Sequence, residues 1–201
     1  MKKNDAVSVA IPGFTLGAVS AGLKTNNALD LCLILSDSPC TAAGVFTRNR
    51  VVGEPVKLDR LHLRHATHRA IVVNSKIANV CTGPEGYANA KAMAAGVAAQ
   101  VGCDPREVFV ASTGIIGRQL PIEKVLAGIE KVFSKCQTEG WEEASRAIMT
   151  TDTYPKLRTR EFVLGGKPVK MAAMAKGSGM IQPNMATMLS FIGTDAAIPK
   201  D

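Results

Sequence analysis

Apolar segments of strand length alternate with helical segments along this chain, and glycines and prolines separate them. Residues 28–36 (ALDLCLILS), 70–74 (AIVVN) and 108–111 (VFVA) are rich in aliphatic side chains, which is typical of buried strands. Between the second and third of these, Tyr87–Gln100 is rich in alanine, which suits a helix that packs closely against a sheet. This alternation predicts a layered α/β or α+β domain.

The remaining elements are expected from the same signals. A proline is favoured in the first turn of a helix, and two adjacent glycines favour a tight hairpin turn. In chain order, we expect a short strand at Gly44–Thr47, helices at Pro121–Phe133 and Gly140–Met149, a hairpin of Arg158–Leu164 and Pro168–Ala173 around Gly165-Gly166, and a last strand at Thr187–Thr194.

The composition indicates a folded domain. Of the 201 residues, 46% are hydrophobic and 20% are charged, whereas disordered chains are poor in apolar residues and rich in charge. No run approaches the roughly 20 uninterrupted apolar residues that a membrane-spanning helix needs. We therefore expect one domain, or a large part of a bigger one, with no membrane association.

The basic residues are scattered, although the formal net charge is +7. The densest basic segment, Arg60–Arg69, contains His62, His65 and His68 but no aromatic residue for base stacking and no known nucleic-acid motif. On a helix, this histidine spacing would drift around the face. We expect a solvated basic segment, no metal site, no nucleic-acid partner and little support for a Ser-His-Asp triad.

Five cysteines are present, an odd number, and no two of them have the CxxC spacing of many zinc and redox sites. At the N-terminus, Met1-Lys2-Lys3 resembles the start of a signal peptide, but Asp5 and Pro12 interrupt the apolar core that would have to follow. These features favour a cytoplasmic protein with reduced, mostly buried thiols.

The segment Lys176–Asp195 (KGSGMIQPNMATMLSFIGTD) is the strongest candidate for chemistry. It matches neither nucleotide-binding glycine pattern. Glycine and proline can hold a strained turn before Ala186, whose small side chain leaves its carbonyl open to attack by the Thr187 hydroxyl. After an N-to-O acyl shift and hydrolysis, Thr187 would become an N-terminus. Its α-amine, with a reference pKa of about 7.7–8.0, would then serve as the base for the Thr187 hydroxyl. The alternative is a threonine that simply begins a buried strand.

The run GSGMIQPNMATML, with Ala186-Thr187 at the scission point, resembles the ornithine acetyltransferase family, the bifunctional glutamate N-acetyltransferases of arginine biosynthesis. The resemblance extends over almost the whole chain, and its separate motifs occur in the family's order. Those motifs are Ala43–Thr47 with Asn49, Asn74-Ser75 with Ala78-Asn79, Thr82-Gly83, Ser112–Gly117 and Met149–Thr153 (MTTDT).

The resemblance implies specific roles for matching residues. Thr187 would cleave the chain after Ala186 and then accept the acetyl group. Thr113 and Gly114 would form the oxyanion hole, which suits a loop that directly follows a strand. Thr153 and Lys176 would bind the amino-acid substrate together with Thr187, with Lys176 opposite a carboxylate.

The resemblance also implies a reaction and a fold. The acetyl group would pass from N-acetylornithine to glutamate through acetyl-Thr187, without a cofactor; acetyl-CoA would be a second donor only in members that make N-acetylglutamate directly. The fold would be that of the ornithine acetyltransferases and self-processing aminopeptidases. The alternatives are a self-processing aminopeptidase that passes the acyl group to water, and an inactive half that needs a partner segment.

Family precursors continue well beyond the nucleophile, and their second half becomes a separate β chain in an α2β2 assembly. The present sequence ends at Asp201, soon after Thr187. The resemblance therefore implies an α-chain domain at residues 1–186 and the first strand of the β chain at residues 187–201. Because the missing half would supply one wall of the site, we expect little activity from the 201 residues alone.

Overall fold

The computed structural model describes residues 9–177 and 188–199. Its first sheet has four strands in the order β1-β2-β3-β4. The pairs β1/β2 and β2/β3 are antiparallel, whereas β3 and β4 are parallel. The strands are β1 (Phe14–Val19), β2 (Leu31–Cys40), β3 (His68–Asn74) and β4 (Val108–Ser112).

The second sheet is antiparallel throughout, in the order β5-β6-β7. It consists of β5 (Lys156–Leu164), β6 (Lys167–Lys176) and β7 (Leu189–Thr194). The predicted hairpin is confirmed, and Gly165 and Gly166 form its turn with φ values of 57° and 77°, a region that favours glycine. The first residue of β7, Leu189, pairs with Lys176 at the end of β6.

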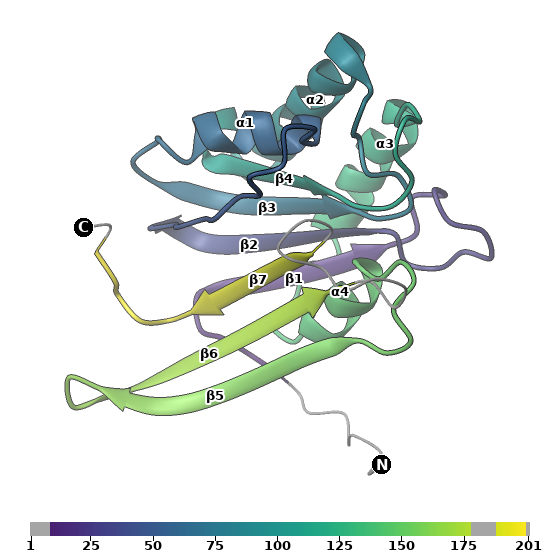
Figure 1. The fold of residues 1–201 in the computed structure, drawn as a ribbon. Coiled ribbons are helices and arrows are strands. Elements are labelled where there is room, and N and C mark those ends of the chain that lie inside the picture. The colour runs from purple at the N-terminus through teal and green to yellow at the C-terminus, as the bar shows by residue number, and fades with distance from the viewer. Residues whose placement is uncertain (1–8, 178–187, 200–201) are drawn as a thin grey trace.

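Helices lie on both faces of the first sheet (Figure 1). One face carries α1 (Glu54–His62), α2 (Gly83–Val101) and α3 (Ile122–Phe133), while α4 (Trp141–Ala147) and the second sheet lie on the other. A hydrophobic core fills each side, and the alanines of α2 allow its close packing. The predicted mixed α/β layering is confirmed.

Trp141 connects the two sheets. Its side chain is fully buried in the core that contains Leu16 of the first sheet and Met174 of the second. A Cβ added to Gly193 of β7 would lie only 2.9 Å from Cη2 of Trp141, so the ring packs directly against this strand. The Trp141 ring thereby holds the second sheet against the first at Gly193, which pairs with Ala172 of β6.

Helix α1 covers the free edge of β4 with polar side chains. Asp59 accepts a hydrogen bond of 2.9 Å from the N–H of Val110, and His62 Nδ1 lies 2.7 Å from the carbonyl oxygen of Val108. A carbonyl oxygen only accepts, so Nδ1 donates in this contact. Both side chains are buried, and the prediction that Arg60–Arg69 is a solvated segment is therefore wrong at His62.

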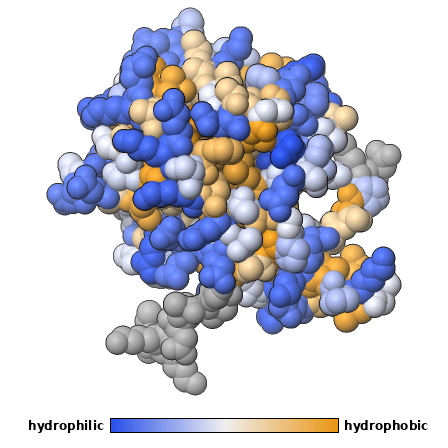
Figure 2. Space-filling model, turned by 180° about the vertical axis from the view of Figure 1, so that it is seen from behind, coloured by the Kyte–Doolittle hydropathy of each residue, from blue (hydrophilic) through white to orange (hydrophobic). Residues whose placement is uncertain are grey.

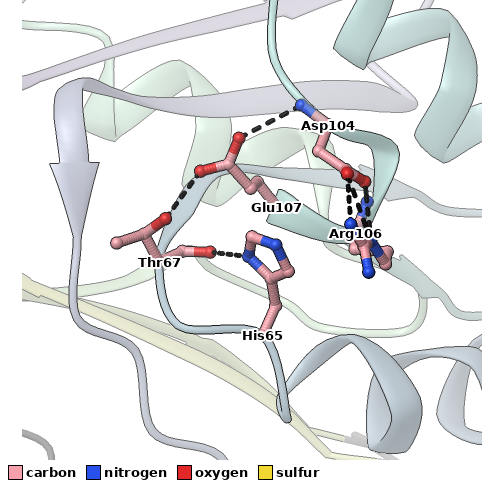
Figure 3. Close-up of polar contacts among 5 residues, drawn as sticks. All are labelled: His65, Thr67, Asp104, Arg106 and Glu107. Carbon is pink, nitrogen blue, oxygen red and sulfur yellow. Dashed lines mark hydrogen bonds and ion pairs between the residues drawn. The ribbon is translucent and has the colours of Figure 1, made fainter.

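The loop after α1 is also fixed by polar contacts (Figure 3). Glu107 accepts a hydrogen bond from Thr67 Oγ1 at 2.8 Å and another from the N–H of Asp104 at 3.1 Å. Arg106 pairs with Asp104 at 2.6 Å, and His65 Nδ1 contacts the Thr67 carbonyl at 3.0 Å. These contacts join the loop to the 3-10 turn that precedes β4, so this segment has a structural role.

Several expected elements differ from the structure. Residues 44–47 form no strand, and His68, in the expected solvated segment, is buried at the start of β3. Strand β1 and helix α1 were not expected, and α2 begins at Gly83 rather than Tyr87. The expected strand at Thr187–Thr194 is described from Leu189 onward as β7.

All five cysteines are free, but only Cys32 is fully buried; Cys81 is exposed and the other three are half-buried. The prediction of mostly buried thiols is therefore wrong. Within residues 9–177 and 188–199, no helix has the length and apolar character required to cross a membrane.

Candidate active site

The candidate site begins where the parallel strands β3 and β4 end. Asn74 and Ser112 are paired in the register of these strands, and Ser112 Oγ donates a 2.6 Å hydrogen bond to Asn74 Oδ1. The N–H of Thr113 donates to the Asn74 carbonyl at 3.0 Å, which continues the pairing by one residue. Carboxyl ends of parallel strands commonly carry functional groups, and here they fix Thr113 rigidly.

Gly114 allows the two loops after these strands to touch. Its φ is 134°, and a Cβ at this position would overlap the backbone of Lys76. On either side of this contact, Ile115 N–H donates to the Lys76 carbonyl and Ala78 N–H donates to the Ile115 carbonyl, both at 2.9 Å. Only a glycine fits here without displacing backbone.

Lys176 reaches this loop from the end of β6. Its side chain is almost completely buried, and Nζ donates hydrogen bonds to Thr113 Oγ1 at 2.8 Å and to Thr150 Oγ1 at 3.3 Å. Burial lowers the pKa of Lys176, and nearby Lys156 lowers it further, while the negative charge of Asp152 opposes both effects. The structure thus brings together Thr113, Gly114 and Lys176.

Asp152 accepts hydrogen bonds from three residues near Lys176. Its Oδ1 accepts hydrogen bonds from Gly177 N–H at 3.1 Å and from Lys156 Nζ at 2.6 Å, and its Oδ2 accepts from Thr150 N–H at 3.2 Å. Burial alone would raise the pKa of Asp152, but these hydrogen bonds outweigh it and hold the pKa below its ordinary value. The carboxylate is therefore charged at neutral pH.

The loop that carries Asp152 is anchored at its start. The carbonyl oxygen of Ala147, the last residue of α4, accepts hydrogen bonds from Ser75 Oγ at 2.5 Å and from Lys24 Nζ at 3.3 Å. Lys24 also donates to the Leu29 carbonyl at 2.7 Å. A cationic group at the C-terminus of a helix is favourable, and Lys24 supplies one here, while the Ser75 hydroxyl links α4 to the end of β3.

Of the three remaining predicted site residues, the structure describes only Thr153. Thr153 follows Asp152 in the chain and is exposed, so it is accessible beside the buried cluster. Ala186 and Thr187 lie outside the described residues. Leu189, two residues after Thr187 in the sequence, is paired with Lys176.

Sequence reasoning missed the roles of Thr150, Asp152 and Lys156. The motif MTTDT contained the first two but did not show that they meet the end of β6, because the contacts of Thr150 with Lys176 and of Asp152 with Gly177 join segments about 25 residues apart. Within the described residues, no three His, Cys, Asp or Glu side chains are grouped so that they could hold a metal ion.

A separate hollow of about 720 Å³ lies between α1 and the start of α2. Two of its basic side chains already have partners: Lys57 pairs with Glu54 at 2.8 Å, and Arg60 donates to the Thr47 carbonyl at 2.8 Å. None of the predicted site residues lines it. The buried cluster of Thr113 and Lys176 is the better candidate, because its groups are fixed and converge.

Comparison with known proteins gives the family. The ArgJ family model matches residues 15–201. The bifunctional arginine biosynthesis protein ArgJ 1 of Clostridium acetobutylicum is 53% identical over 191 residues, which cover 95% of this chain and 47% of that protein. The chain belongs to the ArgJ family. The resemblance to the ornithine acetyltransferases is thus confirmed.

Solved structures support the same assignment to the ArgJ family. A crystal structure of the bifunctional protein ArgJ from Bacillus halodurans is 36% identical, with a TM-score of 0.83, and the match covers 90% of this chain and 95% of that one. The ornithine acetyltransferase of Mycobacterium tuberculosis, solved with ornithine, is 38% identical with a TM-score of 0.76 and coverages of 89% and 95%. The fold is therefore that of ArgJ proteins.

The two kinds of comparison differ in coverage. The chain spans about half the length of the curated ArgJ relatives that it matches, 47% and 48% for the proteins of C. acetobutylicum and Geobacter sulfurreducens. In both solved structures, by contrast, it covers nearly all of the matched polypeptide.

Proposed function

We propose that this chain is the nucleophile-bearing part of an ArgJ acetyltransferase, which moves an acetyl group from N-acetylornithine to glutamate in arginine biosynthesis. The observation that carries the proposal is the hydrogen bond from buried Lys176 to Thr113, within an ArgJ fold. The solved M. tuberculosis relative is described as an ornithine acetyltransferase in complex with ornithine, which supports an ornithine-related substrate.

In this proposal Thr187 is first the residue of self-cleavage. Its hydroxyl attacks the Ala186 carbonyl, the peptide becomes an ester, and water hydrolyses the ester to give a new N-terminal threonine. The difference in coverage supports a divided chain, because a precursor split near this point would give long sequences but short matched polypeptides. The α chain would then comprise residues 1–186, and residues 187–201 would begin the β chain.

The transfer follows in two steps. Thr187 Oγ attacks the acetyl carbonyl of N-acetylornithine, the Thr187 α-amine takes the hydroxyl proton, and ornithine leaves with that proton on its amine. The amine of glutamate then attacks the acetyl ester, which gives N-acetylglutamate and returns the proton to Thr187. This exchange needs no cofactor, and acetyl-CoA is a donor only if the enzyme also makes N-acetylglutamate directly.

Thr113 and Gly114 would stabilise the oxyanion in both steps. Because Thr113 Oγ1 already accepts a hydrogen bond from Lys176, its own hydroxyl hydrogen is available to donate. Among the described residues, no backbone acceptor meets the Gly114 N–H, which makes it a second donor. Fixed donors of this kind favour the transition state because they need no reorientation. Thr153 and Lys176 would hold the amino-acid part of the substrate.

A second chain segment would complete the site, and an α2β2 assembly would follow. The tip of the β5–β6 hairpin supports a partner, because Phe162, Val163 and Leu164 are exposed there. Figure 2 shows this part of the molecule projecting at the lower right, with hydrophobic residues among hydrophilic ones. Exposed apolar groups that gather in one place commonly mark an interface.

The five free thiols favour the cytoplasm as the compartment.

Two measurements test the proposal. Mass spectrometry of the purified full-length precursor would show whether the chain is divided between Ala186 and Thr187. Ornithine release from N-acetylornithine, with and without glutamate, separates a transferase from a hydrolase. Release that depends on glutamate and yields N-acetylglutamate supports the proposal, whereas equal release without glutamate would indicate transfer to water.

A further inference from the structure

Asp152 contacts the chain where β6 ends. Its Oδ1 accepts from the N–H of Gly177, the last described residue before the segment that contains Thr187. The same carboxylate pairs with Lys156, and its charge acts on buried Lys176. Asp152 also accepts from the N–H of Thr150, whose Oγ1 accepts a hydrogen bond from Lys176 Nζ, so it fixes both the residue after Lys176 and a residue that its ammonium group contacts.

Asp152 is not placed to bind substrate. Its side chain is only 1% exposed, and its two oxygens already accept three hydrogen bonds from Thr150, Lys156 and Gly177. A buried carboxylate in this state has little capacity for a further donor. Any effect on the reaction must pass through the groups that it holds.

We propose that Asp152 is a positioning residue, which fixes the backbone at Gly177 and at Thr150 and so keeps the Lys176 ammonium group against Thr113. The inference rests on the proposed function for its catalytic consequence, but the hydrogen bonds of Asp152 to Gly177 and Thr150 do not depend on it. Asp152 acts through Lys176 and Gly177 and touches neither substrate nor reacting atoms.

The charges around the cluster explain why this position matters. Among the described residues, the charged groups that act on Lys176 are Asp152 and Lys156, and Lys24 also interacts with Asp152. Without Asp152, burial and the charge of Lys156 would both favour a neutral Lys176 amine. A neutral amine can accept a hydrogen bond from the Thr113 hydroxyl, and that hydrogen would then be turned away from the oxyanion.

The substitution Asp152→Asn tests this with little change in shape. The asparagine amide has one oxygen, which can face either Gly177 and Lys156 or Thr150. Its NH₂ group must then face the remaining donor, and that hydrogen bond is lost. Glu142→Gln is the matched control, because Glu142 pairs with Arg146 at the same i,i+4 spacing and at 2.7 Å, but both side chains are exposed. Lys156→Met is the third variant, because it removes the neighbouring positive charge and leaves Asp152 in place.

The first measurement is an NMR titration of the Lys176 side chain in the 201-residue chain. We expect Lys176 in Asp152→Asn to lose its proton at lower pH than in the wild type. In Lys156→Met it should lose its proton at higher pH, and in Glu142→Gln at the same pH. Opposite shifts from two neighbouring substitutions are not expected from a general loss of packing.

The second measurement is the pH profile of acetyl transfer by the full-length enzyme. We expect Asp152→Asn to reduce kcat at neutral pH by roughly tenfold or more, since a charge-assisted hydrogen bond is lost. The alkaline limb of its pH profile should move to lower pH, so that part of the lost kcat is recovered on acidification. The alkaline limb of Lys156→Met should move to higher pH.

The outcomes separate the inference from the proposed function. If the wild type transfers acetyl groups and both the Lys176 titration and the alkaline limb are unchanged in Asp152→Asn, the inference is wrong while the function stands. If no variant or wild type transfers acetyl groups, the function is wrong, and the NMR titration still decides the positioning role. If Asp152→Asn does not fold, Asp152→Ser takes its place, and an unchanged titration of Lys176 in that variant overturns the inference.

Discussion

Two regions of the molecule differ in how far their side chains are paired within the chain. One is the end that carries Lys176, and the other is the tip of the β5–β6 hairpin. Around Lys176, buried polar atoms are hydrogen-bonded within the chain, and Thr113 is held in place before any ligand is present. At the hairpin tip, Phe162, Val163 and Leu164 are 39%, 71% and 53% exposed among the described residues. The 201 residues thus contain fixed catalytic candidates beside a surface suited to a partner.

The largest expected effect concerns the nucleophile. Thr187→Ala in the full-length precursor should stop cleavage after Ala186 and reduce acetyl transfer by at least about a thousandfold, because no hydroxyl remains to form the ester. Mass spectrometry and ornithine release measure the two effects. Thr187→Ser is the control and should retain part of both activities. Full acetyl transfer by Thr187→Ala would contradict a covalent mechanism.

The next effect separates the two regions directly. The 201-residue chain alone should release ornithine at least about a hundredfold more slowly than the completed enzyme, because a site without one wall cannot orient its substrate. Adding the second segment should restore the rate. Equal rates with and without that segment would show that the hairpin surface and its partner are dispensable.

The sequence predicted the parts of this fold that local patterns determine. The apolar runs of β3 and β4, the alanine-rich α2 and the Gly-Gly turn of the hairpin all have short-range signals. Strand β1 was missed because Gly17 interrupts its pattern, and that glycine is required by the carbonyl of Val132, which a Cβ would approach to 2.8 Å. This contact joins segments far apart in the sequence.

Helix α1 was missed for a related reason. Two of its buried side chains, Asp59 and His62, are polar, and they are buried because they pair with the edge of β4. At the site, the family resemblance named Thr113, Gly114 and Lys176, and the structure brings them together. Asp152 could not be found in this way, since its contact with Gly177 at the end of β6 spans 25 residues and has no local signal in the sequence.

A smaller effect compares two glycines, one in each region. Gly114→Ala should destabilise the chain by about 2–4 kcal/mol, because its Cβ would overlap the Lys76 backbone at a positive φ. Gly166→Ala is the matched control: its φ is also positive, but no atom lies within 4 Å of the added Cβ, so the cost should be about 1 kcal/mol. Urea unfolding measures both. Equal costs would mean that the loops around Gly114 move apart easily.

The smallest expected effect on the chain itself is at the hairpin tip. Val163 is 71% exposed, so Val163→Ser should change the free energy of unfolding of the 201-residue chain by no more than about 0.5 kcal/mol. Its affinity for the second segment should nevertheless fall, since an apolar contact is replaced by a hydroxyl without a partner. Val51→Ser is the control, because Val51 is 60% exposed in the loop before α1, away from the hairpin. Calorimetric titration with the second segment compares the two. A loss of affinity in Val51→Ser but not in Val163→Ser would place the interface beside α1 instead of at the second sheet.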